Sequence, residues 1–210
     1  MDAAVGIVKA YLELSGYFVL TELPMRVRER GGYRDVTDLD VVAVRFPEGA
    51  GRRDASDSFL DPDPRLGARR NAFDVVIGEV KEGKAALNPA LRRTETIAFA
   101  LRRVGCCPED RVDDEARIIA RRGRREMALG AGLACVVRIV AFAGGHVRTT
   151  GADRTVPLDH CLASIAERLH RRGGALLGAT FKDATLDLIA LQEKLRTEPE
   201  PSPATRPAPA

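Results

Sequence analysis

Residues 73–84 read F-D-V-V-I-G-E-V-K-E-G-K. The run 73–81 is apolar almost to its end, which is typical of a central strand buried on both faces. Successive side chains of a strand alternate between its faces, so Glu79 and Lys81 point the same way. The sequence therefore places a carboxylate and an ammonium side by side at the end of a core strand.

The run before this strand contains two further acids, Asp38 and Asp40. Residues 33–46 read Y-R-D-V-T-D-L-D-V-V-A-V-R-F, and their second half is apolar on both faces, which again predicts a central strand. Strict alternation puts Asp38 and Asp40 on one face with Val42, and Leu39 on the other. The two acids lie where this strand enters the core.

If the two strands are neighbours, the side chains of Asp40, Glu79 and Lys81 converge. Two carboxylates a few ångströms apart repel, and one becomes protonated unless a cation lies between them. Mg²⁺ takes oxygen ligands and keeps several waters, so it suits such a pair. A neighbouring lysine can then orient or deprotonate a metal-bound water, or stabilise the charge that develops on a phosphate. The pattern favours metal-assisted phosphodiester hydrolysis.

The remaining elements are predicted from periodicity and from capping residues. The runs predicted as strands are 17–21, 24–30, 33–46, 73–81 and 133–143, with a short partner at 146–150. The predicted helices are 2–15, 88–104 with Asn88 as N-cap, 113–129, 159–172 and 182–196. Gly31 and Gly32 mark a hairpin between the second and third strands. This order predicts an α/β sandwich.

The 210 residues are enough for one domain with a real core. Residues 1–196 are expected to form that domain, with 47–72 as a long loop insertion. Residues 197–210 read T-E-P-E-P-S-P-A-T-R-P-A-P-A, with five prolines and no large apolar side chain. That segment is expected to be a disordered Pro-rich tail.

The charge is mildly basic, with 33 basic and 30 acidic residues, and arginines recur in pairs. Guanidinium groups match phosphate oxygens, so the pairs are candidate phosphate contacts. The strongest candidate is the R-R-G-R-R run, which contains Arg121, Arg122, Arg124 and Arg125. Internal pairing of these arginines with nearby acids is the alternative.

Four cysteines show no C-x-x-C spacing, and no stretch approaches the ~20 apolar residues that span a membrane. Residues 1–20 lack a secretory signal pattern. No membrane partner is expected, and the expected location is cytoplasmic, with reduced thiols.

The quoted motifs resemble the PD-(D/E)XK nuclease superfamily, with its restriction-endonuclease-like fold. D-L-D-V-V-A-V is similar to the hairpin strand of Mrr-like enzymes and Holliday-junction resolvases, and G-E-V-K is similar to the E-x-K strand. The resemblance covers about residues 3–104 and the later strand 133–143. It implies a three-layer α/β sandwich with a central mixed sheet, and a DNA nuclease using Mg²⁺ or Mn²⁺. No proline precedes the first acid, because Leu39 stands before Asp40.

The resemblance also implies roles for single residues. Asp40 and Glu79 would ligate the metal, with the Val80 carbonyl as a further ligand and Asp38 as a substitute for Asp40. Lys81 would position the attacking water. Glu13, on the first helix, would be an auxiliary metal or water contact. Arg92 and Arg93, on the helix after the motif, would be phosphate contacts.

Other interpretations stay open at this stage. Glu79 and Lys81 can be a salt-linked pair that discourages aggregation at a strand end. Glu13 can be a solvated residue paired with Lys9. The whole domain can bind nucleic acid or a protein partner without cleaving, and both a monomer and a homodimer remain open.

Overall fold

The computed structural model describes residues 2–47, 61–130, 132–145, 149–174, 176–177, 179 and 181–197. Its α-helices are α1 (Ala3–Leu14), α2 (Thr94–Val104), α3 (Val112–Arg122), α4 (Leu158–Gly174) and α5 (Ala184–Thr197). Its strands are β1 (Phe18–Glu29), β2 (Gly32–Arg45), β3 (Phe73–Lys81), β4 (Arg124–Gly130), β5 (Leu133–Ala143) and β6 (Arg154–Pro157). Two short 3-10 turns cover Pro64–Leu66 and Glu109–Arg111.

The strands form one mixed sheet in the order β1-β2-β3-β5-β4. β1, β2 and β3 are antiparallel neighbours, whereas β3 and β5 run parallel, joined by the crossover through α2 and α3. β4 pairs with the first half of β5, and β6 pairs in parallel with its last four residues. The fold is therefore α/β with an open mixed sheet, as the order of elements predicted.

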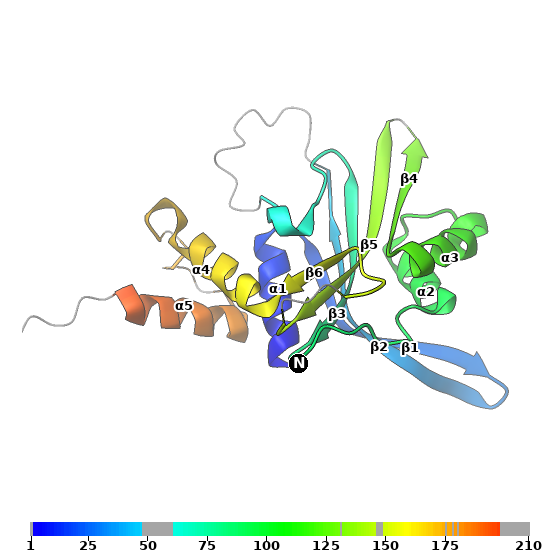
Figure 1. The fold of residues 1–210 in the computed structure, drawn as a ribbon, viewed down its shortest axis with the longest axis horizontal. Coiled ribbons are helices and arrows are strands. Elements are labelled where there is room, and N and C mark those ends of the chain that lie inside the picture. The colour runs from blue at the N-terminus through cyan, green and yellow to red at the C-terminus, as the bar shows by residue number, and fades with distance from the viewer. Residues whose placement is uncertain are drawn as a thin grey trace, which may run out of the picture.

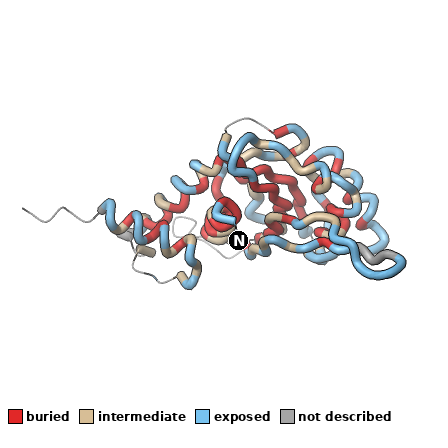
Figure 2. The backbone as a smooth tube through the Cα atoms, turned by 90° about the horizontal axis from the view of Figure 1, so that it is seen from below, coloured by how far each residue is buried: buried red, intermediate tan, exposed pale blue. Residues whose placement is uncertain are grey.

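Helices cover both faces of this sheet (Figure 1). α1, α4 and α5 lie on one face, over a core that includes Val41, Val76 and Phe142. α2 and α3 lie on the other, over a core that includes Ile77 and Ile139. β3 is buried on both faces from its second to its eighth residue, which explains its unbroken apolar sequence. Figure 2 shows the buried central strands and the exposed tip of the β1–β2 hairpin.

Most predicted elements are confirmed within one or two residues, including β3 and β5 at both ends. The two runs predicted as separate strands, 17–21 and 24–30, instead form the single strand β1. The first helix begins as capping rules predict, because the Asp2 side chain accepts a hydrogen bond from the Ala4 amide at 2.8 Å. The hairpin at Gly31 and Gly32 is also confirmed.

Two helix predictions are wrong at a boundary. The helix predicted over 88–104 begins only at Thr94, because Asn88 instead closes a turn in which its side chain accepts the Ala90 amide at 2.9 Å. The helix predicted over 113–129 ends at Arg122, and residues 124–130 form β4. Gly123 separates the two with φ 72°, and a Cβ there would lie 2.7 Å from the Gly151 carbonyl oxygen.

The short partner of β5 is also placed differently. Residues 146–148 lie outside the described residues, and Thr149 and Thr150 are not in a strand. β6 takes that position instead, parallel rather than as a hairpin. Of the expected loop insertion, residues 48–60 lie outside the described part, and so do residues 198–210 of the expected tail; Thr197 ends α5.

Candidate active site

Asp40 and Glu79 face each other one step beyond the last pair of the β2–β3 ladder. That pair is Val41–Gly78, so the next position on each strand is an acid. The Asp40 Oδ2 atom accepts a hydrogen bond from the Val80 amide at 2.8 Å. A side-chain oxygen thus bonds to β3 where the backbone ladder stops, and it fixes the carboxylate against the E-V-K strand.

The strict alternation expected along β2 fails beside Asp40. Leu39 packs in the same core as Val42, whereas Val41 and Ala43 pack in the core on the opposite face. Across from this point, Glu22 of β1 has φ 50°, a conformation that strands do not normally contain. This local distortion changes the face on which the side chains next to Asp40 pack. A sequence pattern of strict period two cannot predict such a distortion.

Glu79 is the most buried acid of the site, with 5% of its surface exposed. Its Oε1 lies 2.7 Å from Lys81 Nζ, and the Asn88 backbone amide also bonds to its carboxylate. Burial raises the pKa of Glu79, the bond to Lys81 opposes that change, and the charge of Asp40 raises the pKa further. The net pKa shift is upward, so the cations present do not fully compensate this carboxylate.

The pKa of Asp40, like that of Glu79, lies above its ordinary value. Burial raises its pKa, and this effect outweighs the Val80 hydrogen bond and the charge of Lys81, which lower the pKa. The charges of Asp2 and Asp38 raise it further. Two neighbouring carboxylates with raised pKa values form a site that an added cation would stabilise.

Lys81 stays protonated at neutral pH. Its hydrogen bond to Glu79 raises its pKa, burial opposes this, and the charges of Glu79 and Asp40 raise the pKa further. Its side chain is 45% exposed, so the ammonium reaches solvent beside the acid pair. Its chemistry in this state is that of a hydrogen-bond donor and positive charge, and not that of a base.

The donor set matches a hard, hydrated divalent cation. A strand residue points its amide and carbonyl to the same side. The Val80 amide points to Asp40, and β2 pairs with β3 no further than Gly78, so the Val80 carbonyl points to Asp40 without a ladder partner from β2. Across the described residues, no three His, Cys, Asp or Glu side chains group as a metal cage. Mg²⁺ is commonly held by one or two carboxylates plus substrate phosphates, so this pair suffices.

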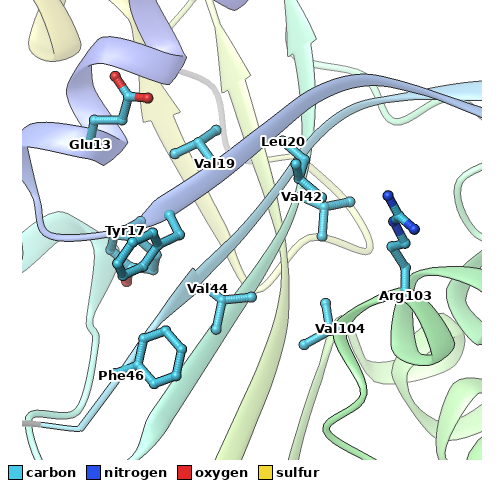
Figure 3. A pocket seen from close by; sticks show the side chains of 10 residues that line it. Glu13, Tyr17, Val19, Leu20, Val42, Val44, Phe46, Arg103 and Val104 are labelled. Carbon is cyan, nitrogen blue, oxygen red and sulfur yellow. The ribbon is translucent and has the colours of Figure 1, made fainter.

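Glu13 does not join the site. Its carboxylate bonds to Lys9 at 3.2 Å, as the alternative interpretation expected, and it borders an apolar groove with Val19 and Val44 (Figure 3). Asp2, at the opposite end of α1, is the residue whose charge acts on Asp40 and Lys81. Asp2 and Glu13 are eleven positions apart in the sequence, which is about 16 Å along the helix axis.

The predicted arginines separate into two groups. Arg92 and Arg121 line one cleft, together with Arg117, which the sequence reasoning missed. Arg125 lies on β4 rather than on a helix, and its Nε is 2.5 Å from the buried Glu115. Arg125 thus stabilises the fold and is not available to a ligand.

The remaining predicted arginines, Arg93, Arg122 and Arg124, are not among the residues that line the cleft. Arg92 and Arg93 belong to the turn before α2, not to the helix, and Arg93 is the exposed N-cap residue of α2. Arg122 is exposed in the last turn of α3, and Arg124 begins β4 half-buried. Asp38 is exposed on β2 and acts on Asp40 through its charge.

Two signals in the sequence could have revealed residues that were missed. Arg117 stands four residues before Arg121, a spacing that puts both on one side of a helix. Asn88 precedes a proline, a pair that favours a turn over a helix start. Asp2 gave no signal beyond its capping role.

The chain matches no family model, no curated protein and no solved structure. Within the described ranges, no helix is both long and apolar enough to cross a bilayer.

Proposed function

We propose that the chain is a metal-dependent nuclease that hydrolyses phosphodiester bonds of DNA. The observation that carries the proposal is the set of groups where the pairing between β2 and β3 ends. Asp40 is bonded to the Val80 amide, Glu79 is buried beside it, and Lys81 is 2.7 Å from Glu79. The resemblance of D-L-D-V-V-A-V and G-E-V-K to PD-(D/E)XK nucleases points the same way.

Each residue of this set has a definite task in the proposed reaction. The free oxygens of Asp40 and Glu79, with the Val80 carbonyl, would hold Mg²⁺ or Mn²⁺. When bound, the ion supplies Lewis-acid stabilisation at a phosphoryl oxygen. The Lys81 ammonium donates a hydrogen bond to the attacking water or to a non-bridging oxygen, where negative charge grows. Water adds to phosphorus and releases one proton to bulk solvent, the bond to the leaving oxygen breaks, and that oxygen takes up a proton from solvent.

A cleavage assay tests the proposal. Labelled single-stranded, duplex and four-way-junction DNA, and single-stranded RNA, are incubated with the wild type in Mg²⁺, Mn²⁺ or EDTA. We expect cleavage of DNA that needs the metal and falls at least about 100-fold in Asp40→Asn, Glu79→Gln and Lys81→Ala. Glu126→Gln is the matched control, because Glu126 is a strand glutamate on β4, away from the site, and it forms an ion pair with Arg69.

Cleavage that persists at the wild-type rate in all three variants would refute the assignment of the site. If the wild type binds DNA without cutting any substrate in either metal, the chain is a binding module of the same architecture. The arginine-lined cleft favours that second function, because it supplies phosphate contacts without any chemistry.

A further inference from the structure

A cleft of about 510 Å³ opens between the turn before α2 and the last turns of α3. Arg92, Arg117 and Arg121 line it, with the hydroxyl-bearing Thr94 and Thr150. Pockets of roughly 300–1,000 Å³ hold small molecules, so the space suits a nucleotide rather than a bare ion. Its polar lining consists of donors, which suits an anionic ligand.

The cleft carries excess positive charge. Within the described part of the chain, Arg92 and Arg121 have no carboxylate partner, and the one side-chain hydrogen bond of Arg92 is a long one, 3.5 Å to the Ala120 carbonyl. Arg117 pairs with Asp114 at 2.7 Å, but both side chains are more than half exposed, so water screens the pair. Three guanidinium groups around one hollow repel each other unless an anion binds between them.

The Arg92 guanidinium lies against the loop before β6. Gly151 in this loop has φ 89°, and a Cβ on it would lie 2.9 Å from the Arg92 Cζ atom. A glycine adopts this backbone conformation without strain and leaves room for the guanidinium. The loop that carries Thr150 therefore approaches Arg92 closely at the wall of the cleft.

The cleft adjoins the acid pair. Leu87 and Pro89 line it, and Asn88 between them donates its amide to the Glu79 carboxylate. A strand whose scissile phosphate lay at Asp40 and Glu79 would thus meet the cleft with a flanking nucleotide. Guanidinium forks bind phosphate oxygens in pairs, and threonine hydroxyls bind phosphate or sugar oxygens.

We propose that this cleft binds the phosphate and sugar of a nucleotide that flanks the reacting phosphate in a nucleic-acid strand. The choice of nucleic acid as ligand rests on the proposed nuclease function, whereas the anion site itself rests on the three arginines. The contact is to the backbone, so it positions the strand and does not read its bases.

Binding without cleavage tests the cleft separately from the chemistry. Fluorescence anisotropy of a labelled oligothymidylate, alone and as a duplex with oligodeoxyadenylate, is measured in EDTA between about 50 and 200 mM NaCl. We expect Arg92→Ala and Arg121→Ala each to weaken binding about tenfold, and to reduce the salt dependence by about 0.7 per lost single-strand contact. Arg121→Lys keeps the salt dependence but loses part of the affinity, because lysine cannot make a fork.

Arg171→Ala is the control, since Arg171 is an exposed arginine of α4 paired with Glu167 on the other face of the sheet. It should bind as the wild type does, and thermal melts should show every variant folded. Wild-type binding by Arg92→Ala and Arg121→Ala, or an equal loss in Arg171→Ala, overturns the proposal. Glu79→Gln should retain binding. If the wild type cuts no substrate but the cleft variants lose binding, the cleft proposal is supported and the nuclease proposal fails. If the wild type cuts DNA but the cleft variants bind as the wild type does, only the cleft proposal fails.

Discussion

The position of single residues explains why a core strand ends in a charged pair. Glu79 is buried and Lys81 is half exposed, so the pair spans the boundary between core and solvent. Simple edge protection would need only exposed charges. A nearly buried carboxylate with a second acid beside it raises the free energy of the metal-free site, and this is what a binding site for a cation requires.

A second buried pair, Asp74 and Arg138, differs from the proposed metal site in how fully its charges are compensated. Asp74 and Arg138 are both at most 1% exposed, on the neighbouring strands β3 and β5. The Arg138 Nε donates to Asp74 at 3.0 Å, its Nη2 also bonds to Asp74, and the Tyr17 hydroxyl donates to the same carboxylate. Three hydrogen bonds, two of them from a buried guanidinium, compensate the charge of this aspartate, so it stabilises the fold.

Removal of this carboxylate should be costly. Asp74→Asn leaves Arg138 buried without a counter-charge, and we expect it to lower the free energy of unfolding by about 3–5 kcal/mol. Urea unfolding measures the change. The double variant Asp74→Val with Arg138→Met should recover part of the loss, because no unpaired charge then remains. A single variant within about 1 kcal/mol of the wild type would show that the pair is not compensating buried charge.

At this scale the sequence placed Glu79 and Lys81 on one face of a strand, because alternation is a local rule. That Asp40 lies beside them depends on β2 and β3 being neighbours, which the sequence states only as a condition. It did not predict Asp2 or the Asn88 amide beside them. Both reach the site through the placement of a helix or turn against the sheet, which depends on packing across the whole domain. Glu13 was chosen for its residue type on the right helix, but it lies at the wrong end.

Among the elements, α3 and β4 show how composition misleads. The R-R-G-R-R run lacks apolar residues, so neither helical nor strand periodicity could locate the break at Gly123. Buried Glu115 joins the two elements, since Arg111 and Arg125 both bond to it at 2.5 Å. This acid therefore fixes the strand that follows the helix, and it removes Arg125 from the basic surface.

The stability that Glu115 provides should depend on pH. Burial raises its pKa, but the hydrogen bonds from Arg125 and Arg111 outweigh burial, and the net pKa lies below the ordinary value. A lowered folded-state pKa gives stability that is present above the unfolded value of about 4.3 and is lost as pH falls through the folded value.

Glu115→Gln measures this contribution. We expect the variant to be less stable than the wild type by about 1–3 kcal/mol at pH 7, with the difference shrinking below about pH 4.3. Thermal or urea unfolding across that pH range gives the comparison. A difference that stays constant down to pH 3 would mean that the charge of Glu115 does not contribute.

In the whole molecule, the acid pair and the cationic cleft lie beside each other at one end of the α2 and α3 layer. The Asn88 turn connects them, because its amide bonds to Glu79 and its neighbours line the cleft. The sequence predicted the α/β class and most elements. It could not predict that Arg92 meets Arg117 and Arg121, since the turn before α2 and the helix α3 are separate segments that the crossover between β3 and β5 brings together.

The most direct measurement is the binding of Mn²⁺ to the free protein, followed by electron paramagnetic resonance. We predict one bound ion in the wild type and at least about tenfold weaker binding in Asp40→Asn and Glu79→Gln. Lys81→Ala should bind Mn²⁺ at least as tightly as the wild type, because the competing ammonium is gone, even though its cleavage activity is lost. Absence of binding by the wild type, or equal binding by Glu79→Gln, would contradict the assignment of this acid pair as a metal site.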